Sequence, residues 1–377
     1  MKIKTPHIIL AACFALLLDV ATVYFSFPEI RYDSEKNKIK NFTLSQLEQY
    51  VSVRHNDKTY STYIKQKSLD IYLKKMQEYS IPVMENAYWH TYCVCQIDLF
   101  IHRKKYRQAE ELALKYLMKL ESCNENFWSN EVNKIEICNF LIQISAWNKD
   151  RDKLTKYEKI YMESLEKLKT YYKKEHQYYE KNQKIYTEFK YNLFFLQQYT
   201  SYLMKNYKKT VDVTRQCDSW LALNKNQISV KEGEQTNDLF LMRSYQKMND
   251  ELNAKKYAER NITAGKKNLT MYLTCYEFLV SFFFREKRYD EALSLCSQVV
   301  SAGKNWKKIP PDDKKDQIYF CCYGIKCCLK TGDPEGVRTF LRIIKKNYFL
   351  LPLKEQTELF LFLLRYKLSG DWFFTPD

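Results

Sequence analysis

Histidine and cysteine are the residue types here best suited to metal binding or nucleophilic chemistry, yet their spacing supports neither. The five histidines are scattered (His7, His55, His90, His102 and His176), and His90 and His102 are twelve residues apart, whereas a helical zinc pair is four apart. The twelve cysteines form no C-x-x-C motif, and pairs such as Cys321-Cys322 lie in apolar helical sequence. We expect buried free thiols, no metal site, and disulfides only in an oxidising compartment.

Catalytic and cofactor motifs are also missing. The first glycine is Gly233, and no glycine pair has the spacing of a phosphate-binding loop before Lys-Ser or Lys-Thr. No G-x-S-x-G nucleophile elbow occurs. The carboxylates of Glu110 and Glu111 lie at the start of an expected exposed helix, where they complement the helix dipole rather than a substrate. The sequence therefore predicts no enzymatic activity and no cofactor.

The net charge of +16 makes nucleic acid and an anionic membrane surface candidate partners. Of the 61 basic residues 48 are Lys and 13 are Arg, whereas bidentate recognition of phosphates and guanine favours Arg. The Lys pairs, such as Lys104-Lys105 and Lys208-Lys209, fall at expected helix ends and loops rather than in one block. We expect solvated helix ends and no specific nucleic acid.

An apolar segment at the N-terminus indicates membrane attachment or export. Residues 8–27 form a twenty-residue apolar stretch in which Asp19 is the one charged residue, and Lys2 and Lys4 precede it. Twenty helical residues just span the hydrocarbon core of a bilayer. An uncleaved anchor, a cleaved signal and a lipoprotein with lipidated Cys13 remain open, and a buried N-terminal helix is the non-membrane alternative. If the lysines stay inside, the body faces the periplasm or cell exterior.

Beyond this segment, the sequence indicates helices almost throughout. Residues 28–42 are expected to form a linker, because they lack periodic apolar positions and carry alternating charge. In 152–174, apolar residues recur in steps of three or four, which predicts an amphipathic helix. The segments 185–203 and 270–285 predict two more. Only 7 Gly and 8 Pro occur in 377 residues, too few for the turns of a sheet-rich fold, so we expect an all-α fold.

A local pattern recurs along the chain. Lys287 to Leu293 (KRYDEAL) follows the apolar helix 270–285, and Lys105 to Ala109 and Gly332 to Val337 repeat its turn-then-helix arrangement. This pattern resembles the second-helix entry of a tetratricopeptide repeat, in which a small residue lets two antiparallel helices approach closely. The alignable positions are Ala109, Leu154, Thr210, Ala254, Ala292 and Val337, at spacings of 45, 56, 44, 38 and 45 residues.

The resemblance implies an α-solenoid of antiparallel helical hairpins over residues 43–377, behind a signal or anchor segment (1–27) and the linker (28–42). The repeat-packing residues would be Tyr106, Ala109, Tyr289 and Ala292. Such repeats commonly bind peptides or partner helices on a concave face, in a right-handed superhelix.

The resulting hypothesis is a non-catalytic, membrane-tethered module that binds a protein or peptide as a scaffold or sensor. A lipid-anchored surface protein that binds glycans is the alternative, and it would need surface tryptophan; Trp89, Trp128 and Trp147 instead lie in apolar helical sequence. A basic solenoid that binds RNA is the weaker alternative, because the export-like N-terminus speaks against it.

Overall fold

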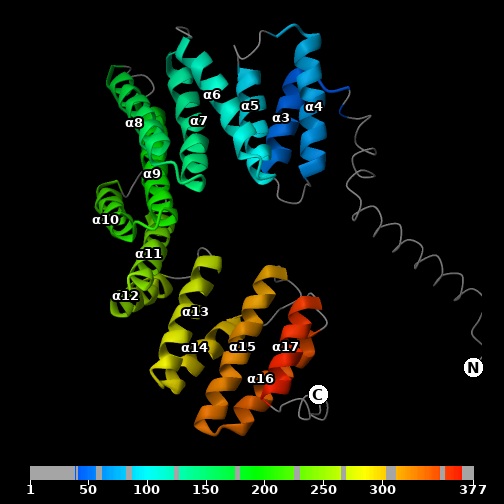
Figure 1. Cartoon of the computed structure of the whole chain (residues 1–377), viewed down its shortest axis with the longest axis vertical. Coiled ribbons are helices and arrows are strands. Elements are labelled where there is room, and N and C mark those ends of the chain that lie inside the picture. Colours follow the sequence, from blue (N-terminus) through cyan, green and yellow to red (C-terminus); the bar gives the residue numbers. More distant parts are fainter. Residues whose placement is uncertain are drawn as a thin grey trace, which may run out of the picture. The chain divides into compact units, whose positions relative to one another are not determined.

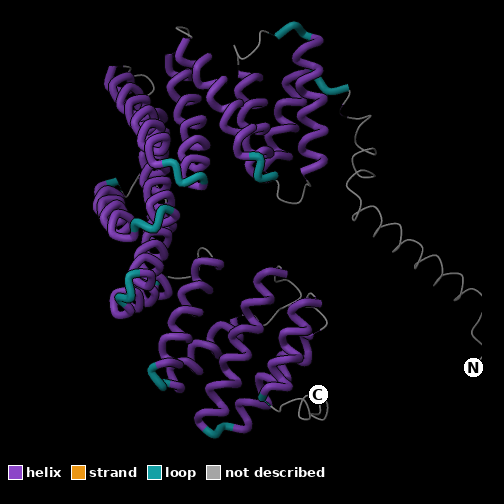
Figure 2. The backbone as a smooth tube through the Cα atoms, viewed as in Figure 1, coloured by secondary structure: helices purple, strands orange, loops and turns teal. Residues whose placement is uncertain are grey.

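The computed structural model describes residues 39, 41–56, 62–81, 87–122, 127–174, 179–224, 230–264, 269–302, 311–348 and 353–366. In these ranges the chain forms fifteen helices and no strand (Figures 1 and 2), which confirms the expected all-α fold. The helices are α3 (Leu44–Asn56), α4 (Thr62–Glu78), α5 (Ala87–His102), α6 (Tyr106–Ser122), α7 (Phe127–Trp147), α8 (Arg151–Lys174), α9 (Tyr179–Leu203), α10 (Tyr207–Leu223), α11 (Val230–Lys247), α12 (Glu251–Thr263), α13 (Leu269–Arg285), α14 (Tyr289–Ala302), α15 (Pro311–Thr331), α16 (Pro334–Asn347) and α17 (Leu353–Arg365).

The apolar period of each segment decides which helix face is buried. In α16, Val337, Phe340, Leu341 and Ile344 are buried, and they recur every three or four residues. The same helix begins at Pro334, directly after Asp333, whose carboxylate accepts a hydrogen bond from the backbone N–H of a residue in the first turn. A sequence with this period and this cap specifies a helix locally, and packing of its apolar stripe fixes its orientation.

Six turns between consecutive helices share one conformation. In the α13–α14 turn, the N–H of Lys287 donates to the carbonyl of Phe284 at 3.2 Å, and the N–H of Arg288 donates to the carbonyl of Phe283 at 2.9 Å. This is the Schellman arrangement, which ends a helix with one left-handed residue. The left-handed residues of the six turns are Lys104 (φ 57°), Lys149 (57°), Lys205 (58°), Asn249 (60°), Lys287 (59°) and Gly332 (72°).

The next helix begins two residues after each left-handed residue, and the residue between them is the N-cap. Arg288, for example, accepts a hydrogen bond at its carbonyl from the N–H of Ala292, at 3.2 Å. In the other five turns, the residue whose N–H donates the corresponding hydrogen bond is Ala109, Leu154, Thr210, Ala254 or Val337. The six positions aligned from the sequence are therefore equivalent in the structure. All six side chains are buried. The six turns therefore define six helical hairpins, α5–α6, α7–α8, α9–α10, α11–α12, α13–α14 and α15–α16.

Helices that are consecutive in the chain pack against each other in two series. One series runs from α3 to α8, and the other runs from α10 to α16. The first helices of successive hairpins also contact each other: α5 contacts α7, α11 contacts α13, and α13 contacts α15. Sequential neighbour packing of this kind is the arrangement of an α-solenoid.

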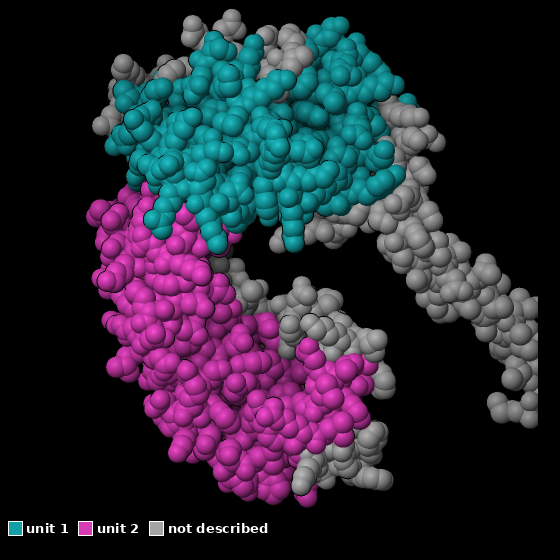
Figure 3. Space-filling view, in the orientation of Figure 1, with its two compact units in different colours: residues 1–190 teal, residues 191–377 magenta. Residues whose placement is uncertain are grey.

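The chain divides into two compact units, residues 1–190 (unit 1) and 191–377 (unit 2), with the boundary inside α9 (Figure 3). Unit 1 buries large side chains such as Tyr72 and Ile97. Unit 2 has one continuous core from α10 to α17, in which Gly324 allows α16 to approach closely: a methyl group on Gly324 would lie 2.4 Å from the ring of Phe340.

The N-terminal predictions are only partly covered by the described residues. Within the expected linker, Ile39 is 1% exposed and packs in a small core with Ile64, against which Phe42 also packs. Residues 8–27 and Cys13 lie outside the described residues. In the described part of the chain, no helix is both long enough and apolar enough to cross a membrane.

Candidate functional site

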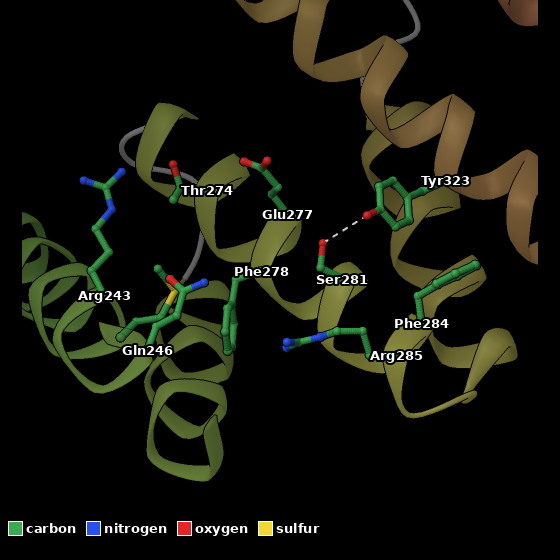
Figure 4. Close-up of a pocket in the computed structure, with 10 residues that line it drawn as sticks. Arg243, Gln246, Thr274, Glu277, Phe278, Ser281, Phe284, Arg285 and Tyr323 are labelled. Carbon is green, nitrogen blue, oxygen red and sulfur yellow. Dashed lines mark hydrogen bonds between the residues drawn. The ribbon is translucent and has the colours of Figure 1, made fainter. Parts of the chain in front are cut away.

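A cavity of about 430 Å³ lies in unit 2, on the face formed by the first helices α11, α13 and α15, which we call the first-helix face (Figure 4). Each of these helices belongs to a different hairpin, so the cavity exists only because the hairpins are stacked. Its lining residues are Met242, Arg243 and Gln246 from α11, Thr274, Glu277, Phe278, Ser281, Phe284 and Arg285 from α13, and Tyr323 from α15.

The central helix, α13, places most of these side chains through its helical period. It is apolar and buried on most of its circumference, with Cys275, Leu279 and Val280 among its buried residues. Its polar residues Thr274, Glu277, Ser281 and Arg285 recur every three or four positions and therefore lie along one stripe. That stripe faces the cavity, and the apolar remainder packs into the core of unit 2.

Aromatic rings and hydroxyl groups form the wall of the cavity next to α15. Ser281 Oγ donates to the hydroxyl of Tyr323 at 3.4 Å (Figure 4), and it lies 3.0 Å from the hydroxyl of Tyr319. The rings of Tyr319 and Tyr323 are 4.7 Å apart, and the Phe284 ring meets Tyr323 edge-on at 5.7 Å. Burial raises the pKa of Tyr319 well above its ordinary value, so this hydroxyl is neutral at physiological pH.

The rim of the cavity carries both signs of charge. Arg243 and Glu277 are exposed, and in the described part of the chain neither forms an ion pair or hydrogen bond. Arg285, in contrast, is paired: its Nη2 lies 2.9 Å from Glu251 Oε1. Figure 4 shows Phe278 between the α11 side chains Arg243 and Gln246 and the α13 side chain Ser281. The site thus offers one available cation and one available anion beside aromatic surface.

The repeat-packing residues predicted from the sequence lie at hairpin turns. Ala109 and Ala292 have no accessible surface. Tyr106 is half-buried, with its ring centroid 5.2 Å from that of Trp147. Tyr289 is also half-buried, and its ring packs edge-on against Phe284 at 5.3 Å. Because Phe284 lines the cavity, the turn residue Tyr289 packs against a residue of the cavity wall.

Neither the cavity residues nor the partners of the histidines were predicted from the sequence. His55 Nε2 lies 2.7 Å from Asp98 Oδ2, which links α3 to α5, and His102 Nε2 is 3.2 Å from the same oxygen. The available signal was the four-residue spacing of Asp98 and His102 on one helix. For the cavity, the signal was the polar stripe along the otherwise apolar α13.

Cysteines and carboxylates in the described ranges form no group of three that could hold a metal ion. Ten described cysteines are free and nine of them are buried. Burial raises the pKa of Cys93 and Cys138 to about 12, so these thiols pack as small apolar groups rather than react as thiolates.

A buried polar network holds α9 to α12 together within unit 2. Gln198 Nε2 donates to Asn237 Oδ1 at 2.9 Å, and Asn237 Nδ2 donates to Asp218 Oδ1 at 2.6 Å. Arg260 bridges two carboxylates, donating from Nε to Asp238 at 2.5 Å and from Nη2 to Asp218 at 3.3 Å. Burial raises the pKa of Asp238 to about 6, although the hydrogen bond from Arg260 acts to lower it.

Comparison with known proteins gives no family. No protein-family model and no curated protein matches the chain. One similar solved structure is described as a "Circular tandem repeat protein with novel repeat topology and enhanced subunit contact surfaces". It is 11% identical, the alignment covers 95% of this chain and 74% of that chain, and the TM-score is 0.23. The fold assignment therefore rests on the helices and their packing.

Proposed function

We propose that this chain is a non-catalytic helical-repeat module that binds a peptide or a segment of a protein on the first-helix face of unit 2. The observation that carries the proposal is the cavity between α11, α13 and α15, which is lined both by the half-buried rings of Phe284 and Tyr323 and by the available charges of Arg243 and Glu277. Binding sites typically combine apolar and aromatic walls with a few placed polar groups.

The composition of the cavity favours binding over catalysis. Its serine, Ser281, hydrogen-bonds to tyrosine hydroxyls, and no histidine, cysteine or aspartate is among the lining residues. A serine nucleophile needs a hydrogen-bonded general base, whereas the groups that contact Ser281 are the hydroxyls of Tyr319 and Tyr323, and Glu277 forms no hydrogen bond in the described part of the chain. The same groups suit recognition, because hydroxyls and rings together contact the backbone and side chains of a peptide.

We also propose that residues 8–27 tether this module to a membrane, with the body outside the inner membrane. The support is the apolar run behind Lys2 and Lys4. Protease added to intact spheroplasts should digest the body from about residue 30 onward. Full protection until lysis would contradict this topology.

Peptide display on the purified full chain tests the binding proposal. Peptides selected on the natural chain should lose binding to Gln246→Trp, because the exposed Gln246 lines the cavity and an indole there would fill its mouth. They should keep binding to Ser297→Trp, a matched substitution at an exposed position of the second helix α14 in the same unit. Equal binding to both variants would refute the first-helix face as the peptide site.

A further inference from the structure

The last helix in the described part of the chain, α17, exposes an apolar surface, which we call the α17 face. Its residues Phe360, Leu361 and Leu364 are 39%, 59% and 46% exposed. They lie on one side of the helix, because residues three and four apart are neighbours on a helix surface. The other large apolar side chains that are exposed in the described ranges each lie alone, in different parts of the chain. A contiguous apolar surface of this kind indicates an interaction site, whereas single exposed residues are ordinary.

A different side of α17 packs into unit 2. Leu359 and Leu363 are buried in the core of that unit, and Lys326 Nζ of α15 lies 5.8 Å from the centre of the Phe362 ring. Helix α17 follows the α15–α16 hairpin (Figure 1), so it stands where the first helix of a further hairpin would stand. In the hairpins α11–α12, α13–α14 and α15–α16, the second helix packs against the first. No helix follows α17 in the described ranges, so the α17 face lacks this cover.

The residues that directly follow α17 have the composition of a cover for the α17 face. Residues 367–377 lie outside the described residues, and their sequence is KLSGDWFFTPD, with an aromatic run at 372–374. Residues 368–377 contain two aspartates and no basic residue. On α17, Arg365 is exposed, forms no ion pair within the described ranges and lies one turn from Leu361. Aromatic rings with acidic charge therefore match an apolar surface with a cation at its edge.

The connection is long enough for the segment to fold back. The first residue after α17 lies about 9 Å from Phe360 along the helix axis, at 1.5 Å per residue. The five residues 367–371 can extend over roughly 16 Å. They include Ser369-Gly370, a dipeptide typical of turns, which a reversal of direction needs. In extended backbone, side chains two residues apart point to the same side, so the rings of Trp372 and Phe374 can contact the α17 face together.

From these observations we infer that residues 368–377 fold back onto the α17 face, with the aromatic run 372–374 on its apolar side chains and Asp371 near Arg365. Because the contact is intramolecular, the segment acts at a high effective concentration and excludes competing apolar surfaces. Its role is to close the end of the stacked hairpins, since an uncovered apolar surface at the end of a repeat array stacks onto other molecules. None of these residues lines the cavity, so the cover is independent of the proposed peptide site.

Quenching of Trp372 fluorescence by acrylamide measures whether the segment is covered. The emission of Trp372 is the difference between the natural chain and Trp372→Phe, because the chain has six tryptophans. A synthetic peptide of residues 368–377 gives the value for a fully exposed indole. In the purified full chain, Trp372 should be quenched several-fold less than in the peptide, at all protein concentrations. Quenching equal to that of the peptide would overturn the inference.

A substitution on the α17 face identifies where the segment lies. In Leu361→Glu, the new carboxylate opposes both the apolar contact and Asp371, so Trp372 should be quenched as strongly as in the peptide. The matched control Leu252→Glu changes an exposed leucine of α12 in the same unit and should leave the shielding of Trp372 unchanged. Thermal melts by circular dichroism establish that both variants are folded. Shielding that survives Leu361→Glu would place the segment elsewhere and refute the α17 face as its site.

Removal of residues 368–377 tests the role of the cover. The truncated chain should self-associate more strongly than the natural chain in sedimentation measurements, and Leu361→Glu in the truncated chain should reverse this gain. Self-association no stronger than that of the natural chain would contradict the role. If the shielding of Trp372 in the natural chain is lost on dilution, together with a change from dimer to monomer, a second copy covers the surface and the intramolecular contact is refuted.

Discussion

The backbone N–H of Arg288 donates to the carbonyl of Phe283 at 2.9 Å, which closes the end of α13 around the left-handed residue Lys287. A side chain at positive φ costs roughly 1–2 kcal/mol relative to an ordinary helical conformation, a cost that glycine avoids. Lys287→Gly should therefore raise the free energy of unfolding by up to about 1 kcal/mol, after the larger entropy of glycine in the unfolded chain is included.

Lys256→Gly is the control for this prediction, because Lys256 is exposed in the interior of α12. It should destabilise the chain by about 1 kcal/mol. Denaturant unfolding monitored by circular dichroism measures both values. A loss of stability in Lys287→Gly as large as that in Lys256→Gly would show that the left-handed turn is not under strain.

Ala292 is the second test of the hairpin geometry, since its methyl group is completely buried at the start of α14. Ala292→Leu should overpack this contact and cost about 1 to 3 kcal/mol. Glu291→Gln, at the exposed neighbouring position, should change stability by no more than about 0.5 kcal/mol. Hydrogen exchange should show lost protection in α13 to α16 and retained protection in α5 and α6, because stacked repeats interact chiefly with their neighbours. Uniform loss along the chain would indicate a single cooperative bundle.

The hairpin turns were predictable because their signals are local. The turn and the following small or apolar residue recur around Ala109, Ala254 and Ala292, and all three side chains are buried. The left-handed conformation of the turns was not predictable, because glycine seldom marks it in this sequence. Five of the six left-handed residues are lysine or asparagine, so Schellman turns form here without glycine. Lys104 and its counterparts thereby account for part of the lysine found at helix ends.

The cavity was not predictable in the same way. Arg243, Glu277 and Tyr323 are 34 and 46 residues apart along the chain, and only the rotation and register of three packed helices bring them to one place. Those parameters depend on side-chain packing between hairpins, which no local pattern encodes. The sequence does contain the polar stripe of α13, but a stripe alone does not distinguish a cavity wall from a solvated helix face.

The buried carboxylate of Asp238 predicts an unusual pH dependence of unit 2. Its pKa is about 6, above the ordinary 3.8, so between these values the folded state binds more protons than the unfolded state. The contribution of Asp238 to stability is therefore greatest below pH 4 and is lost as pH rises through 6. The free energy of unfolding that Asp238 contributes differs by about 3 kcal/mol between the two ends of this range.

Asp238→Asn provides the comparison, because an amide does not titrate in this range. The difference in unfolding free energy between pH 7 and pH 5 should be smaller in Asp238→Asn than in the natural chain. Denaturant unfolding at the two pH values measures it. An identical pH dependence in both proteins would mean that Arg260 keeps Asp238 charged throughout.

Asp98 predicts the opposite sign in unit 1. Burial acts to raise the pKa of Asp98, but the hydrogen bond from His55 and the charges of His55, His102 and Lys65 outweigh it, and the pKa is lowered. Its stabilising contribution is present above its unfolded pKa near 4 and lost as pH falls through the lower folded value. Asp98→Asn should cost about 1 to 3 kcal/mol at pH 7, because it weakens the link from α5 to His55. Glu78→Gln, in an exposed pair on α4, should cost less than about 1 kcal/mol. Equal effects would contradict a structural role for the Asp98–His55 pair.

Site-specific photo-crosslinking tests most directly whether the first-helix face of unit 2 binds a polypeptide. Benzoylphenylalanine replaces the exposed Gln246 at the cavity mouth or, as the control, the exposed Ser297 on α14, in the full chain expressed in its native cells. Irradiation of the Gln246 variant should yield an adduct with a polypeptide segment, identified by mass spectrometry, that is absent from the Ser297 variant. Crosslinks to the same segment at both positions, or at Ser297 alone, would contradict the assignment of the cavity as the binding site.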